Sequence, residues 1–246
     1  MSEIKGVFFD LGGTLRLCEP DEAHQTAARN RMAELAGFED PAAFIEMIDQ
    51  RYETTYRKWA MEENKESGDY ELWAKWLLPE LPEAKLQEIC HEMTFLYRQV
   101  KGKRHIVEGG VNVIRTLHAR GYKLGIISNL IGEEEVYDWL RNDDLEQYFS
   151  SVVLSSICHI RKPDPEIYRI ACRELGLRPE ECVSVADNLN RDITGAKAAG
   201  IGMNILCISE EKLKKKTITD ENRPDIILHR FASLTDLAAL QGREEA

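Results

Sequence analysis

The sequence predicts an α/β protein in which helices cover both faces of a parallel sheet and an all-helical segment is inserted into the chain. Over residues 1–15 and 108–246, short apolar runs that end in polar residues or glycine alternate with helical patterns, as expected of a parallel sheet. Residues 16–107 show helical periodicity and no strand-like run. We therefore expect a core domain (1–15 and 108–246) and a helical domain (16–107).

The core strands are predicted from apolar runs that stop at turn residues. Residues 6–9 form the first run, which breaks at Asp10 before two glycines, and residues 123–129 and 182–187 have the same form. Shorter runs complete the sheet at residues 152–154, 204–208 and 225–228. Helical patterns cover residues 111–120, 165–175, 192–199 and about 233–240. The predicted fold is therefore a Rossmann-like sheet, and ligands of such sheets lie beyond the carboxyl ends of the strands. Four polar residues fall there: Asp10, Ser128, Asn129 and Asp187.

The inserted segment contains four expected helical stretches. They cover residues 21–36, a stretch that begins at Asp40-Pro41, residues 70–78 and residues 82 to about 98. Aromatic residues recur at helical spacing in the second and third stretches, and we interpret them as the core of a helical bundle. Because the segment follows the first strand directly, we expect it to pack as a lid over the site.

The composition of the chain indicates which partners the protein can bind and in which cellular compartment we expect it. The formal charge of -11 and the pI near 5.2 argue against nucleic acid and anionic membranes, which attract basic surfaces. The six cysteines include no C-x-x-C pair, and no apolar run is long enough to span a membrane. We expect a cytoplasmic protein with free thiols and a small-molecule substrate, while the oligomeric state is not predicted.

Four segments, in order along the chain, resemble the four motifs of the haloacid dehalogenase (HAD) superfamily. They are FFDLGGTL at 8–15, ISN at 127–129, RKPDP at 161–165 and VADNLNRDITGAKAAG at 185–200. The inserted helices resemble the C1 cap of that superfamily. The resemblance implies a hydrolase, and most directly a magnesium-dependent phosphatase acting on a small phosphorylated metabolite.

The resemblance also implies roles for individual residues. Asp10 would be the nucleophile that forms an aspartyl-phosphate, and Lys162 and Ser128 would assist it around the phosphoryl group. Thr14 and Asn129 would join Ser128 and Lys162 in binding the substrate. Magnesium would be held by Asp10, the main-chain carbonyl of Gly12 and Asp187, with Asn188 and Asp192 next to these ligands.

Gly12 departs from the motif, because phosphatases of this superfamily carry an acid/base aspartate there. Such a group contributes roughly 10² to 10⁴ in rate. A substrate with a good leaving group, a substitute acid or a weak enzyme could each account for the glycine. Possible substitutes in the segment that enters the cap are His24, Glu19 and Cys18.

Three other functions stay open at this stage. A haloacid dehalogenase also lacks the second aspartate and needs no metal. A phosphonate hydrolase would use a cap lysine, for which the unplaced candidates are Lys58, Lys65, Lys75 and Lys85. A binding or regulatory protein could keep the fold without turnover.

Overall fold

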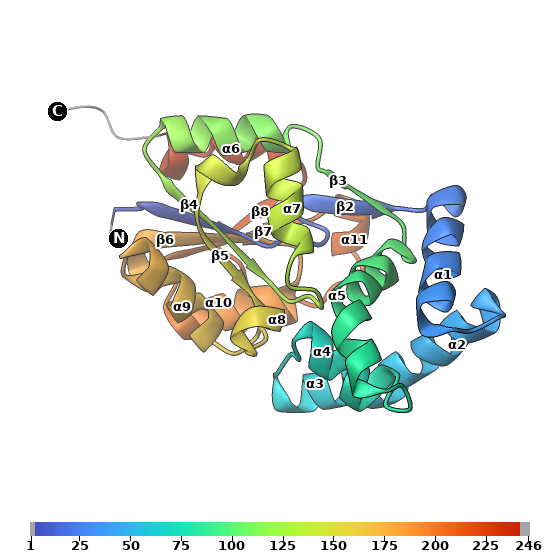
Figure 1. Ribbon diagram of the computed structural model, residues 1–246. Helices are drawn as coiled ribbons and strands as arrows, with labels where there is room; N and C mark the ends of the chain where they lie inside the picture. The colour runs from blue at the N-terminus through green and yellow to red at the C-terminus, as the bar shows by residue number, and fades with distance from the viewer. Residues whose placement is uncertain (1–2, 242–246) are drawn as a thin grey trace.

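The computed structural model describes residues 3–241, and its centre is a six-stranded parallel sheet (Figure 1). The strand order is β5-β4-β1-β6-β7-β8. All six predicted strands are present: β1 (Gly6–Phe9), β4 (Lys123–Ser128), β5 (Phe149–Leu154), β6 (Cys182–Ala186), β7 (Met203–Cys207) and β8 (Ile226–Leu228). The predicted α/β fold class is therefore confirmed.

Strand β1 lies between β4 and β6, and this pairing determines where the site residues meet. Phe9 is in register with Ile126 on one side and with Val185 on the other. The residues just beyond these three positions therefore emerge at the same edge of the sheet. Asp10, Ser128 and Asp187 all belong to that edge.

Successive side chains of β1 point to opposite faces of the sheet, as the strand period of two requires. Val7 and Phe9 belong to an apolar cluster with helices α6 (Gly110–Ala119) and α7 (Glu135–Asn142). Phe8 belongs to a second cluster with α9 (Glu166–Leu175) and α10 (Thr194–Ala199). Because both faces are covered, the whole of β1 is buried and reads as a continuous apolar run.

The inserted helices form a separate group beside the sheet, at the right of Figure 1. They are α1 (Glu22–Ala36), α2 (Pro41–Arg51), α3 (Arg57–Glu63), α4 (Asp69–Glu71) and α5 (Glu83–Gln99), with π-helical turns at Tyr52–Tyr56 and Leu72–Leu77. Asp21 and Asp40 cap the first two helices, and Gly37 ends α1 in the left-handed region at φ 77°. Their apolar residues pack into a cluster of their own that includes Tyr56 and Trp73. The interpretation of the aromatic residues as bundle core agrees with this packing.

Two short strands within residues 16–107 contradict the prediction that this segment contains no strand. β2 (Arg16–Glu19) pairs antiparallel with β3 (Lys103–Ile106). Both strands are only four residues long, are partly exposed and carry charged side chains. Their pairing depends on residues far apart in the sequence, so no local apolar pattern could indicate it.

The predicted helix at about 233–240 was also wrong, because the chain forms 3₁₀ turns at Phe231–Asp236 and Ala238–Leu240. The helix expected from residue 192 begins as a π-helical turn at Leu189–Ile193 and becomes α-helical only in α10. Three helices were not predicted, namely α7, α8 (Ser155–Cys158) and α11 (Glu210–Leu213).

Among the described residues, none of the helices has the length and apolar character needed to cross a membrane. All six cysteines are free thiols.

Candidate active site

Asp10 lies directly after β1 and is almost fully buried, at 5% exposure. Its main-chain N–H donates to the Val185 carbonyl (3.0 Å), which continues the β1–β6 ladder by one residue. The Thr14 hydroxyl donates to Asp10 Oδ2 at 3.4 Å. Thr14, for which substrate binding stays a prediction, thus contacts the expected nucleophile.

The turn after Asp10 requires glycine at position 13. Gly13 has φ 84°, and a Cβ added there would lie 2.3 Å from Oδ2 of Asp187. Residues other than glycine are strained at such φ values. The close approach brings the Asp10 turn against Asp187, which joins the first and last motifs at the edge of the sheet.

Lys162 is buried, at 3% exposure, and places its ammonium group among three oxygen atoms. Nζ lies 2.7 Å from Asp10 Oδ1, 2.6 Å from Asp192 Oδ1 and 2.9 Å from the Ile127 carbonyl oxygen. The contacts with Asp10 and Ile127 are hydrogen bonds, and the contact with Asp192 is an ion pair. The structure therefore brings Lys162 and Asp10 together, as the motif resemblance implied.

Asn129 holds the loop that carries Lys162. Its side-chain Nδ2 donates to the Lys162 carbonyl (2.9 Å), and its Oδ1 accepts from the Lys162 N–H (2.8 Å). The side chain therefore fixes the main chain of the lysine, and its predicted contact with the substrate stays a prediction. Ser128 is buried at the end of β4, and Asn129 follows it directly. Both residues therefore lie at the same edge of the sheet as Asp10.

Three carboxylates meet at this edge, with one ligand atom each from Asp10, Asp187 and Asp192 lying within 4.8 Å of one another. Arg191 lies among them. Its Nη2 is 2.9 Å from Asp192 Oδ2, 3.7 Å from Asp187 Oδ1 and 3.8 Å from Asp10 Oδ2. Arg191 was not predicted, although it lies inside the motif, immediately before Asp192 and four residues after Asp187.

The remaining predicted residues have the following positions. Asn188 is the N-cap of the turn that begins at Leu189, and its Oδ1 accepts from the Arg191 N–H at 3.0 Å. Gly12 is exposed beside Asp10.

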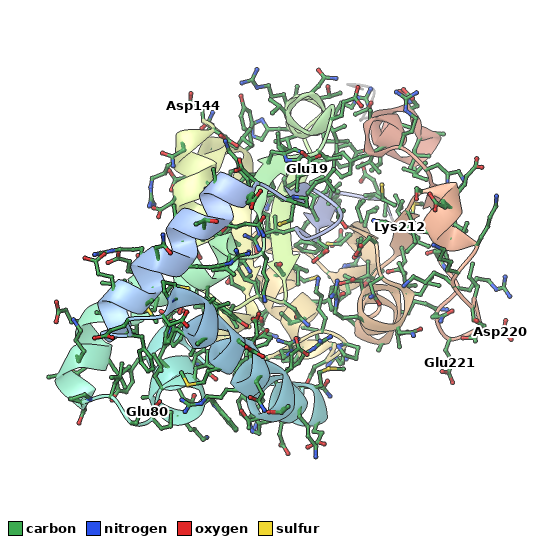
Figure 2. All side chains as sticks on the ribbon, turned by 90° about the vertical axis from the view of Figure 1, so that its right-hand side faces the viewer. Glu19, Glu80, Asp144, Lys212, Asp220 and Glu221 are labelled. Carbon is green, nitrogen blue, oxygen red and sulfur yellow. The ribbon has the colours of Figure 1, made fainter. Side chains whose placement is uncertain are left out.

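The three suggested substitutes for the missing acid have other partners. His24 contacts Gln99 (3.1 Å), the Cys18 thiol donates to the Lys101 carbonyl (3.5 Å), and Glu19 pairs with His105 (3.7 Å). Figure 2 shows Glu19 at the upper end of α1, where the chain enters the helical insert.

The electrostatics of the cluster indicate a shortage of positive charge. Burial raises the pKa of Asp10 above its ordinary value, although Lys162 opposes the shift. Burial, together with the charges of Asp10 and Asp192, raises the pKa of Asp187 to about 6. Burial also disfavours the charged form of Asp192, but Lys162 and Arg191 outweigh it and lower that pKa. Three carboxylates thus face two cations, so an added cation would be stabilised here.

This donor set fits magnesium. The ion prefers hard oxygen ligands and often uses only one or two carboxylates, the rest being water and phosphate. Asp10 and Asp187 supply such oxygens within the 4.8 Å cluster. The Gly13 turn, in which a Cβ would collide with Asp187, brings the two segments close enough to share one ion.

Known proteins agree with this assembly of motifs. Residues 4–200 match the family described as haloacid dehalogenase-like hydrolase. The chain is 31% identical over 219 residues to the phosphoglycolate phosphatase of Salmonella paratyphi A, which covers 81% of this chain and 80% of that protein. It is 27% identical over 254 aligned positions to the glyceraldehyde 3-phosphate phosphatase of Pyrococcus furiosus, covering 96% and 94% of the two chains.

The fold is shared with solved structures as well. One is the HAD-hydrolase YfnB from Bacillus subtilis bound to magnesium, which has a TM-score of 0.60 at 20% identity and covers 96% of this chain and 98% of that chain. At this identity the likeness shows a common fold. Together with the match over residues 4–200, the paired Asp10 and Lys162 and the carboxylate cluster show that the chain belongs to the haloacid dehalogenase-like hydrolases.

Proposed function

We propose that the protein is a magnesium-dependent phosphatase that hydrolyses a small phosphorylated metabolite through an aspartyl-phosphate on Asp10. The observation that carries the proposal is the contact of the Lys162 ammonium with Asp10 (2.7 Å) beside the carboxylate cluster. Phosphoryl transfer needs an in-line nucleophile and positive charge around the transferred group. The names of the relatives described above, a phosphoglycolate phosphatase and a glyceraldehyde 3-phosphate phosphatase, support the same class of substrate.

In the first half of the reaction, an Asp10 carboxylate oxygen attacks phosphorus, and the bond from phosphorus to the ester oxygen breaks. The Lys162 ammonium contacts Asp10 in the ligand-free site. During the transfer it can stabilise the negative charge on the phosphoryl oxygens. The Ser128 hydroxyl, at the end of β4, is the proposed hydrogen-bond donor to the same oxygens. The departing alkoxide takes up a proton from water, and the alcohol leaves.

In the second half, water attacks the aspartyl-phosphate, phosphate leaves and Asp10 is restored. An acid/base group at position 12 would serve both halves, and Gly12 supplies none. We therefore expect the best substrates to be those whose leaving groups need little protonation, or whose rate is limited by another step.

Asp10, the Gly12 carbonyl and Asp187 are the proposed magnesium ligands, with Asp192 and Asn188 next to them. When bound, the ion would stabilise negative charge on the phosphoryl oxygens and lower the pKa of Asp10 into the range a nucleophile needs. Arg191 adds a fixed positive charge on the same side, 3.8 Å from Asp10.

The test is phosphate release from a panel of phosphate esters, with magnesium and with excess EDTA. We expect release that depends on magnesium and falls by roughly 10³-fold or more in Asp10→Asn, as for the loss of a nucleophile. Thr235→Ala, which removes a hydroxyl that donates to the Ala232 carbonyl of its own turn at 3.4 Å, is the control. If the unmodified protein releases no phosphate from any ester, the phosphatase proposal is wrong.

Two alternatives make different predictions in the same assay. A dehalogenase would release halide from 2-haloacids without metal, and Gly12 with Ser128-Asn129 is compatible with it. The carboxylate cluster around Asp187 favours the metal-dependent reaction. A phosphonate hydrolase needs a lysine aimed at the site, whereas Lys58, Lys65 and Lys75 are exposed and Lys85 pairs with Glu88 at 3.7 Å.

A further inference from the structure

A pocket of about 180 Å³ lies between the inserted helices and the sheet, next to the proposed phosphate site. The inserted segment contributes its basic and aromatic residues, and the core contributes residues 129–131 and Arg161. Four of the lining residues are basic and none is acidic: Arg98, Lys101, Arg104 and Arg161. This is unusual for a chain whose formal charge is -11.

Two of these four charges are balanced by a carboxylate of their own. Lys101 Nζ lies 2.6 Å from Asp49 Oδ1. Arg161 pairs with Glu66, which is fully buried. These two residues therefore add little net charge to the pocket.

Arg98 and Arg104 share one carboxylate instead of having one each. Together with Arg16 they surround a single buried carboxylate, Glu135, which is 7% exposed. Arg98 pairs directly with Glu135, while Arg16 and Arg104 each approach Glu135 Oε1 only to 3.9 Å. All three arginine side chains are at most 17% exposed. Asp143 is a further acid that acts on Arg16, but its carboxylate already accepts from the Trp139 indole at 2.5 Å.

The arginines are held in place despite their mutual repulsion. Arg104 Nη1 donates to the Arg98 carbonyl (2.7 Å), Arg16 Nη2 donates to the Arg104 carbonyl (3.2 Å), and the Arg16 guanidinium lies 4.5 Å from the centre of the Trp139 ring. Burial and the neighbouring Arg98 charge lower the pKa of Arg104. Burying charge without a counter-charge is costly, and an anion in the pocket would remove that cost.

The pocket and the phosphate site share a wall. Asn129 lines the pocket, and the same side chain holds both main-chain polar groups of Lys162. Arg161, also in the lining, is the residue before Lys162. A ligand with its phosphoryl group at Asp10 would therefore extend past Asn129 toward Arg98 and Arg104.

We infer that Arg98 and Arg104 form a subsite for a second anionic group of the substrate, so that the preferred substrate is a phosphate monoester with a carboxylate or a second phosphate at its other end. The inference rests on the proposed function, because it assumes that the first phosphate binds at Asp10. Tyr52 and Tyr97, which also line the pocket, would pack against the short carbon chain between the two groups.

Three compounds with the same two-carbon backbone test the inference: 2-phosphoglycolate (carboxylate end), 1,2-ethanediol bisphosphate (phosphate end) and 2-hydroxyethyl phosphate (neutral end). The dissociation constants are measured by calorimetry in Asp10→Asn with magnesium, which prevents turnover, and kcat/KM is measured in the unmodified protein. We expect at least one anionic compound to be preferred over the hydroxyl compound by about tenfold to a hundredfold, as for a hydrogen bond to a charged group. The anion that shows the larger preference identifies the second group.

Arg104→Gln is the diagnostic variant, and Arg31→Gln is its matched control. Arg31 is also a cap arginine with carboxylate partners, Glu34 and Glu92, but it is exposed and does not line the pocket. We expect Arg104→Gln to reduce the preference at least tenfold without lowering the melting temperature of the ligand-free protein more than Arg31→Gln does. Equal binding of all three compounds to Asp10→Asn, or an unchanged preference in Arg104→Gln, would overturn the inference. A preference in Asp10→Asn without phosphate release by the unmodified protein would leave the subsite intact and reject the phosphatase proposal instead.

Discussion

The molecule contains two buried charge clusters of opposite sign on either side of Asn129. At the end of β1, three carboxylates face Lys162 and Arg191. At the junction with the inserted helices, three arginines face Glu135. The first cluster would be stabilised by a cation and the second by an anion. This pair of clusters is what we expect if the protein binds a metal ion together with a substrate that is negatively charged at both ends, as proposed above.

Lys162→Met removes the ammonium that contacts two of the three carboxylates in the first cluster. We expect this variant to have the largest effect. Asp10 and Asp192 would be left without the ammonium at 2.7 and 2.6 Å. We expect phosphate release to fall by roughly 10³-fold and the free energy of unfolding to fall by about 3 kcal/mol, because a buried pair loses one partner. Urea denaturation and steady-state kinetics measure both effects. The control is Lys197→Met, since that lysine is exposed and donates to the Asp220 carbonyl. Equal losses in the two variants would contradict the prediction.

Glu135→Gln tests the second cluster by removing its only central carboxylate. Three buried guanidinium groups would remain around a neutral amide, and we expect the free energy of unfolding to fall by about 3 kcal/mol. Glu92→Gln, which removes an exposed partner of Arg31, should cost less than about 1 kcal/mol. Urea denaturation at low salt compares the two. If Glu135→Gln is as stable as Glu92→Gln, the arginines are not under electrostatic stress and the comparison of the clusters fails.

Gly12→Asp adds an acid to the first cluster. A Cβ at position 12 meets nothing within 4 Å, and the backbone there does not have a positive φ, so the side chain can be accommodated without strain. We expect kcat for alkyl phosphates to rise by about 10²-fold, the lower range for a positioned acid/base. Gly12→Asn has the same shape without the acid and should give no gain. Equal rates in the two variants would show that proton transfer does not limit turnover.

Asp187 should give the smallest effect, a pH dependence of stability in the metal-free protein. The groups that face it are Asp10 and Asp192, which raise its pKa, and Arg191 and Lys162, which lower it. Because the folded-state pKa is about 6 against an ordinary 3.8, the folded protein retains a proton that the unfolded chain has released. The stability contributed by this proton is present below pH 3.8 and lost as the pH rises through 6.

In excess EDTA we expect this loss to be on the order of 2 kcal/mol or less between pH 4 and 7. Thermal denaturation in this range is compared with that of Asp187→Asn, which cannot titrate and should lack this part of the profile. Identical profiles for the two proteins would mean that the charge of Asp187 is already balanced without metal.

The sequence predicted the first cluster much better than the second, and the reason is where the residues lie. Asp10 and Asp187 follow apolar runs that are easily recognised as buried strands, and parallel strands bring such ends together. Arg191 was missed because nothing local shows toward which side the first turn of a helix directs a long side chain. The side-chain bonds of Asn129 to Lys162 were missed because two distant loops form them.

The second cluster could not be predicted, since Arg16, Arg98, Arg104 and Glu135 come from β2, the end of α5, β3 and the start of α7. Two of those elements, β2 and β3, were themselves not expected, and each is too short and too polar to be recognised alone. The arginines read singly as ordinary solvated residues of a charged segment. Their burial around one carboxylate exists only after the inserted helices return to the sheet.

The parallel sheet, the helical insert and the motif residues at the carboxyl ends of the strands could all be predicted from the sequence, because periodicity and turn residues are local properties. The tertiary structure alone decided which side chains of those motifs touch: Lys162 with both Asp10 and Asp192, Arg191 among the three carboxylates, and Asn129 with the Lys162 main chain. It also decided that three arginines share Glu135. The pKa of a buried group depends on every residue that excludes water from it or carries a charge near it. Those residues are neighbours in space and not in sequence.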